Sequence, residues 1–220
     1  MEAKEKFPGI FLIDNKLAVR NQVSGWHPFG EQLIKLGKTE YRLWDPNRSK
    51  LGAAIMKGLK NVPIHEGDKI LYLGIAHGFT ASFVSSIIGT SGIIYGVEFA
   101  SRVFTELLPI TEKVKNIVPM MADARKPEMY SWVEQCDVVY EDVAQPDQTE
   151  IAIRNCRQIL KKGGYLMIAV KTQSIDVTAP AKKTIDQEVK KLEDAGFEII
   201  DVRSLEPFEE RHGFIVAKMS

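Results

Sequence analysis

From Lys69 onward, apolar runs that suit buried strands alternate with segments of helical periodicity, and this alternation constrains the fold more than any other feature. Near-continuous Val, Ile and Leu runs are typical of strands buried on both faces. Alternation with helices predicts an α/β fold with a doubly wound, mostly parallel sheet. We expect seven strands: 69–73, 93–99, 116–124, 137–143, 164–171, 197–205 and one from His212. The last two are joined by a short connection and should therefore be antiparallel.

The first part of the chain has a different character. Residues 10–23 alternate around Asp14-Asn15-Lys16, which predicts a β-hairpin. Ser49 is the expected N-cap of a helix that runs to about Gly58. We therefore expect a small β-rich module at 1–55 and the main α/β domain at 56–220. The aromatic side chains expected to pack the module onto the main domain are Trp26, Phe29, Tyr41 and Trp44.

Composition narrows the function classes. The 220 residues include 29 basic and 29 acidic ones, and this zero net charge argues against tight independent binding to a polyanion. Binding through a local patch or a partner protein stays open. The two cysteines, Cys136 and Cys156, are expected to be reduced and buried. Without a secretory signal or an apolar run of transmembrane length, the expected location is the cytoplasm, with no membrane association.

The stretch KILYLGIAHGFT, residues 69–80, runs from a strand through a glycine turn into a helix. Such a joint brings backbone N–H groups at a helix N-terminus close to a nucleotide-like ligand. The turn glycines are Gly74 and Gly78, and their Gly-x-x-x-Gly spacing does not match the Gly-x-Gly-x-x-Gly of dinucleotide sites. An NAD enzyme is therefore disfavoured. No Gly-x-Ser-x-Gly elbow of a hydrolase is present, and the four dispersed histidines do not indicate a metal site.

Polar or glycine residues follow the apolar strands at their carboxyl ends, where ligands bind in parallel sheets. These residues are Gly74, Glu98, Asp123, Asp142 and Lys171. An acid at the end of the second strand is typical of ribose recognition, which we expect for Glu98. Glu141, Asp142 and Asp147 place three negative charges near one strand end. Some of these acids must be solvated or paired, so only one is expected to take part in catalysis. Lys171 ends the most apolar strand at the ligand-binding edge.

Several segments of the chain carry a family resemblance: YRLWDPNRSKLGAAI (41–55), YGVEF (95–99), ADAR (122–125), DVAQPDQ (142–148), KTQSIDVT (171–178) and LEPFEERHGF (205–214). Together they resemble the fibrillarin family, the RNA 2′-O-methyltransferases of C/D-box guide ribonucleoproteins. The resemblance covers nearly the whole chain and implies an S-adenosylmethionine site. The implied cofactor-binding residues are Gly74, Gly78 and Thr80 at the turn, Glu98 at the ribose, Phe99, Asp123 and Ala124 at the adenine, and Asp142 and Gln145 near the methionine. Where the family turn usually has small residues this chain has His77 and Phe79, and His77 is a further cofactor-binding candidate.

The same resemblance implies a catalytic group of Lys50, Asp142, Lys171 and His212. Alignment of the ribose hydroxyl with the methyl donor supplies much of the rate of such a reaction. Lys171 would stabilise the developing alkoxide, and Asp142 would orient Lys171. Lys50 and His212 would place the substrate ribose and phosphate.

The resemblance also implies partners. They are a Nop-family scaffold protein, a C/D-box guide RNA with its target RNA, and a kink-turn-binding ribosomal-type protein, and weak self-association is a further expectation. The Gly/Arg-rich extension of the eukaryotic proteins is lacking, so the chain looks like the archaeal form, acting on pre-rRNA and tRNA. Two alternatives stay open: an assembly subunit whose enzyme activity is secondary, and methylation of protein glutamine side chains.

Overall fold

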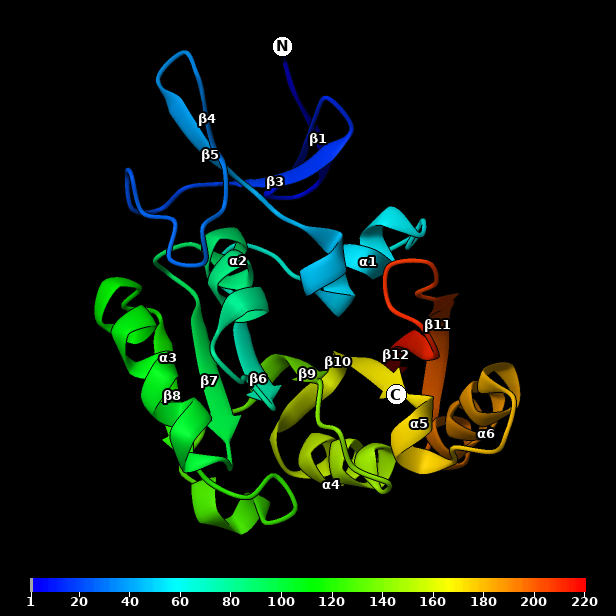
Figure 1. The fold of residues 1–220 in the computed structure, drawn as a ribbon. Coiled ribbons are helices and arrows are strands. Elements are labelled where there is room, and N and C mark those ends of the chain that lie inside the picture. The colour runs from blue at the N-terminus through cyan, green and yellow to red at the C-terminus, as the bar shows by residue number, and fades with distance from the viewer. Residues whose placement is uncertain (1) are drawn as a thin grey trace.

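The computed structural model describes residues 2–220, which form two separate sheets (Figure 1). The smaller, N-terminal sheet is antiparallel with the order β1-β2-β3-β5-β4. Its strands are β1 (Ala3–Phe7), β2 (Ile10–Ile13), β3 (Lys16–Arg20), β4 (Leu33–Leu36) and β5 (Thr39–Leu43). The predicted hairpin is confirmed as β2 and β3, and its turn residues Asp14 and Asn15 have φ of 48° and 63°. Positive φ at both positions is typical of tight hairpin turns.

The larger sheet has the order β11-β12-β10-β9-β6-β7-β8. Its strands are β6 (Lys69–Leu73), β7 (Ile93–Glu98), β8 (Ile117–Met121), β9 (Cys136–Glu141), β10 (Leu160–Lys171), β11 (Phe197–Ser204) and β12 (His212–Met219). Strands β6 to β10 pair in parallel, whereas β12 is antiparallel to both β10 and β11, as expected. The strand order reverses between β6 and β9, and parallel sheets bind ligands at such a switch point.

Helices cover both faces of the larger sheet (Figure 1). They are η1 (Pro46–Arg48), α1 (Lys50–Met56), α2 (Phe79–Ile88), α3 (Ser101–Lys113), η2 (Pro127–Tyr130), α4 (Gln148–Ile159), α5 (Thr172–Ile175) and α6 (Ala181–Asp194). Alternate residues of β6 enter two core clusters, one shared with α1, α2 and α3 and the other with α4 and α6. The predicted cap is confirmed, since Ser49 Oγ accepts from Gly52 N at 3.2 Å.

Two expectations from the sequence are wrong. The strand expected from Gly164 begins at Leu160, directly after α4, because Leu160 already pairs with Cys136 of β9 and the register then shifts before Tyr165. Tyr41 does not pack onto the main domain but lies against Phe11 within the small sheet, with ring centroids 5.2 Å apart. The neighbouring Arg42 faces the main domain instead, since successive strand residues point to opposite faces.

The other three aromatic residues, Trp26, Phe29 and Trp44, pack the small sheet against the main domain as expected. Trp44 stacks on Phe83 of α2 with centroids 4.9 Å apart, and Phe29 contacts Phe79 at 5.2 Å. Trp26 packs against the same core cluster. The division at residue 55 stays a prediction. Both cysteines are buried and free, and no helix in the described part of the chain has the length and apolarity that crossing a bilayer requires.

Candidate functional site

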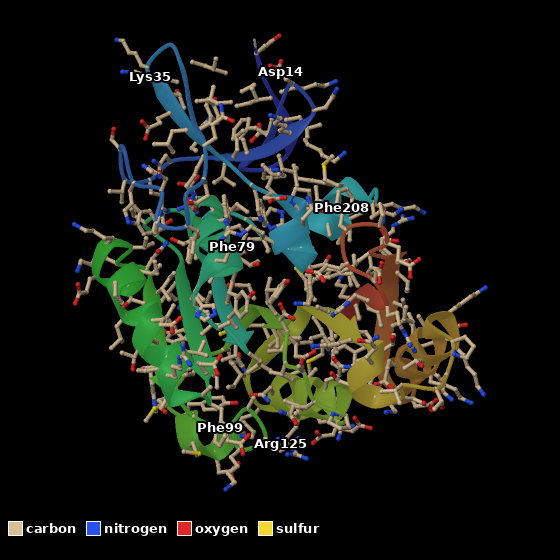
Figure 2. The ribbon with its side chains drawn as sticks, viewed as in Figure 1. Asp14, Lys35, Phe79, Phe99, Arg125 and Phe208 are labelled. Carbon is tan, nitrogen blue, oxygen red and sulfur yellow. The ribbon has the colours of Figure 1, made fainter. Side chains whose placement is uncertain are left out.

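A cavity of about 320 Å³ lies at the carboxyl ends of the central strands, beside the switch point between β6 and β9. Its size falls in the range of small-molecule sites, about 300–1,000 Å³. The lining residues are Gly74, Ala76, Val97, Glu98, Phe99, Ala100, Ala122, Asp123, Ala124, Arg125, Asp142, Val143, Ala144, Gln145 and Ile151. Seven of the ten predicted cofactor residues are therefore together here; His77, Gly78 and Thr80 are not among them. Figure 2 shows Phe99 and Arg125 at the same end of the molecule.

Gly74 lets the end of β6 approach the segment after β9. Its φ is +75°, and a Cβ built there would lie 2.8 Å from the carbonyl oxygen of Asp142. Gly78 has a different role, because a Cβ there would lie 2.7 Å from Leu107 Cδ1 of α3. Gly78 therefore packs the turn against α3, whereas Gly74 shapes the cavity itself.

Glu98 holds the glycine turn through one carboxylate oxygen and the start of α3 through the other. Its Oε2 accepts from Ala76 N at 3.0 Å, and its Oε1 accepts from Ala100 N at 2.8 Å. Each carboxylate oxygen can accept a second hydrogen bond, so the group can still receive a ligand hydroxyl. The adjacent Phe99 is 74% exposed and lines the cavity. An exposed aromatic face at a cavity suits stacking against a planar ring.

Arg125 was not predicted as a site residue, although the ADAR segment contains it. Its guanidinium donates to Asp147 at 2.6 and 3.0 Å and to Gln145 Oε1 at 2.8 Å. Its backbone N–H donates to Asp123 Oδ1 at 2.9 Å. The hydrogen bonds from Arg125 hold the pKa of Asp147 below its ordinary value. The signal available in the sequence was an arginine two residues after Asp123, the acid that follows β8.

Lys50 and Asp142 form an ion pair at the edge of the cavity. Lys50 Nζ lies 2.9 Å from Asp142 Oδ1 and 3.1 Å from Oδ2, and the two side chains are 22% and 20% exposed. Burial opposes the lysine charge, but the facing carboxylate outweighs it and raises the pKa of Lys50. Burial also raises the pKa of Asp142, against the opposing effect of Lys50. Asp142 is therefore paired with Lys50, and its expected role in orienting Lys171 stays a prediction.

Lys171 and His212 face each other across the antiparallel pairing of β10 with β12. Buried Gln148 holds the backbone at Lys171, accepting from its N–H at 3.3 Å and donating to its carbonyl at 3.5 Å. His212 Nδ1 lies 2.7 Å from the carbonyl oxygen of Glu210. A carbonyl only accepts, so Nδ1 carries the proton and Nε2 is left to face other groups.

His77 and Thr80 do not line the cavity. His77 Nδ1 lies 2.9 Å from Glu106 Oε2 on α3, and both side chains are about half exposed. Thr80 Oγ1 is buried and donates to Ser49 Oγ at 3.0 Å, which connects the start of α2 with the start of α1. A role of either residue in cofactor binding stays a prediction. Within residues 2–220, no three His, Cys, Asp or Glu side chains are grouped so that they could hold a metal ion.

Comparison with known proteins identifies the family. The model of the family described as Fibrillarin matches residues 1–220. The chain belongs to the fibrillarin family. A curated relative, the fibrillarin-like rRNA/tRNA 2′-O-methyltransferase of Pyrococcus abyssi, is 51% identical, and the match covers 98% of this chain and 97% of the relative.

Solved structures of fibrillarins have the same fold. The fibrillarin pre-rRNA processing protein of Methanococcus jannaschii superposes with a TM-score of 0.95 at 45% identity, covering 99% of this chain and 97% of that one. Aeropyrum pernix fibrillarin with natively bound S-adenosyl-L-methionine superposes with a TM-score of 0.91 at 45% identity, covering 99% of this chain and 98% of that one. The fibrillarin chain of a fibrillarin/Nop5p complex superposes with a TM-score of 0.90 at 37% identity, covering 99% of this chain and 100% of that one. The two-sheet fold of this chain is therefore the fibrillarin fold.

Proposed function

We propose that the chain is an S-adenosylmethionine-dependent RNA ribose 2′-O-methyltransferase, the catalytic subunit of a C/D-box guide ribonucleoprotein with rRNA and tRNA as targets. One observation carries this proposal. Asp142 lines the cavity and is also paired with Lys50, so the cavity and a group of candidate catalytic side chains meet at one residue. The names of the curated relatives and the cofactor in the A. pernix structure support it.

The side chains around the cavity fit S-adenosylmethionine. Gly74 lets the segment after β9 come close, so that Asp142 and Val143 line the cavity, and Glu98 keeps acceptor capacity for ribose hydroxyls. Asp123 uses Oδ1 on Arg125 N and has Oδ2 left for the adenine amino group, beside Phe99. Asp142 and Gln145 complete the proposed binding set, with Ala124 at the adenine edge. When bound, the cofactor supplies a methyl group on a positively charged sulfur.

The proposed mechanism rests mainly on positioning, because a ribose hydroxyl is a poor nucleophile and alignment lowers the barrier. The Asp142 carboxylate, which is paired with Lys50, accepts a hydrogen bond from the ribose hydroxyl and orients it. Lys171 stabilises the negative charge that develops on that oxygen, and the Asp142 carboxylate takes up the hydroxyl proton as the methyl group is transferred. His212, whose Nδ1 is fixed by the carbonyl of Glu210, offers Nε2 to the substrate ribose or phosphate.

RNA affinity is proposed to come mostly from partners. The solved fibrillarin/Nop5p complex supports a Nop-family scaffold as the partner of this chain as well. The guide RNA and a kink-turn-binding protein complete the proposed particle. With 29 basic and 29 acidic residues, the chain by itself should bind RNA weakly.

The test is a methyl-transfer assay in which scaffold, guide RNA, kink-turn protein and target RNA are added stepwise, after calorimetry with S-adenosylmethionine. We expect binding of the cofactor by the chain, and methylation only in the assembled particle. Lys171→Ala should abolish methylation while cofactor binding is kept. Lys162→Ala, which removes an exposed lysine of the same strand, is the control. Full methylation by a particle assembled with Lys171→Ala would refute the assignment of Lys171 as a catalytic group.

A further inference from the structure

Arg125 connects the two loops that form opposite walls of the cavity. One wall follows β8 and contains Asp123, Ala124 and Arg125; the other follows β9 and contains residues 142–145. Between them, the guanidinium of Arg125 donates to Gln145 and, through two nitrogens, to Asp147. A two-point contact between a guanidinium and a carboxylate fixes the plane of the guanidinium. The position of the third bond, to Gln145, is therefore fixed as well.

The contact with Arg125 determines the direction of the Gln145 amide. A guanidinium has only donors, so the amide must turn its oxygen, its single acceptor group, toward Arg125. The distance from Arg125 Nη2 to Gln145 Oε1 is 2.8 Å. The amide NH2 of Gln145 then has no hydrogen-bond acceptor among residues 2–220. Because Gln145 lines the cavity, this NH2 is a donor available to a ligand.

The donor of Gln145 complements the other polar side chains of the cavity. Besides Arg125 and Gln145, the polar side chains of the lining are the carboxylates of Glu98, Asp123 and Asp142, which are acceptors when ionised. Gln145 is tied to the wall that carries Asp123, where the adenine is proposed to lie. Adenine carries an amino group, which needs an acceptor, next to a ring nitrogen, which needs a donor. Asp123 and Gln145 can supply this acceptor and this donor from the same wall.

We infer that Arg125 is a positioning residue that makes Gln145 a donor to a ring nitrogen of the adenine. Gln145 is thereby assigned to the nucleoside end of the cofactor, not to the methionine end that the family resemblance implies. This assignment rests on the proposed function, since it takes S-adenosylmethionine as the ligand. The backbone of Arg125 is itself held, because its carbonyl accepts from Arg154 Nη1 at 2.6 Å.

Gln145→Glu separates the donor role from a structural one. The substituted carboxylate can still accept from Arg125, and with a charge, so a purely structural contact would be kept or strengthened. It has no NH2, however, and would turn a carboxylate oxygen toward the ring nitrogen. We expect the dissociation constants of both S-adenosylmethionine and adenosine to rise about ten-fold or more, since an unpaired buried acceptor costs roughly that factor. Calorimetry with each ligand measures both constants.

Arg125 is tested in the same way. Arg125→Ala should weaken both ligands, because Gln145 is no longer held; Arg102→Ala, at a 92% exposed arginine of α3, is the control. The thermal unfolding midpoint of each variant shows that it is folded. Unchanged binding by Gln145→Glu would overturn the inference. So would weaker binding of S-adenosylmethionine with unchanged adenosine, because Gln145 would then lie at the methionine end. Failure of the unaltered chain to bind S-adenosylmethionine would instead refute the proposed function.

Discussion

Replacing Gly74 with alanine should damage both stability and the cavity. The left-handed conformation at φ +75° costs an alanine about 1–2 kcal/mol. The new Cβ would also lie 2.8 Å from the carbonyl oxygen of Asp142, and 3.0 Å from both its carbonyl carbon and Val143 Cγ1. Two of these atoms are backbone, so relief requires a shift of the segment after β9, and overpacking of this kind costs about 1–3 kcal/mol. The sum is a loss of about 2–5 kcal/mol in the free energy of unfolding.

Gly163 provides a matched control. It has the same φ of +75°, but a Cβ there would meet nothing within 4 Å. Gly163→Ala should therefore cost only the conformational part, about 1–2 kcal/mol. The difference between the two variants isolates the steric contact of Gly74 with Asp142 and Val143.

Urea unfolding followed by circular dichroism and by tryptophan fluorescence measures the free energies, and calorimetry measures binding of S-adenosylmethionine. We expect Gly74→Ala to be less stable than Gly163→Ala by about 1–3 kcal/mol. It should also bind the cofactor at least several-fold more weakly, because Asp142 and Val143 both line the cavity. Equal stability of the two variants, or cofactor binding by Gly74→Ala as in the unaltered chain, would show that the close approach at Gly74 does not shape the site.

Three further predictions concern buried groups. Burial raises the pKa of the fully buried Glu141 well above its ordinary value, so the stability that its protonated form contributes is lost as pH rises. In urea titrations from pH 5 to 8, the free energy of unfolding of Glu141→Gln should therefore increase relative to that of the unaltered chain. A difference that stays constant with pH would contradict this prediction. Lys50→Met should lower the free energy of unfolding by about 3 kcal/mol, because it leaves Asp142 buried and unpaired. The double variant with Asp142→Asn should recover most of this loss, whereas strictly additive losses would exclude a coupled pair. Trp44→Ala removes the ring stacked on Phe83 and should lower the free energy of unfolding, measured by chemical denaturation, by about 3–5 kcal/mol. A loss below about 1 kcal/mol would show that this stack does not join the two sheets.

Much of the site could be predicted because it depends on local pattern and on the geometry of parallel sheets. The strands around β6 were found from their apolar runs, and their carboxyl ends necessarily meet at one edge. Gly74, Glu98, Asp123 and Asp142 follow those strands and do line one cavity. The strands β1 and β4 of the small sheet were not predicted, because both lie at its edges and lack a clear alternation of apolar residues.

The sequence by itself determined the alternation of strands and helices, the glycine turn and the polar residues at the strand ends, since each depends on neighbouring residues. Only the tertiary structure decided which side chains meet. Lys50 reaches Asp142 across 92 positions because α1 packs beside the sheet, and Arg125 bonds Gln145 because two loops after different strands lie side by side. Such contacts depend on how separate elements pack, and no local pattern records that packing.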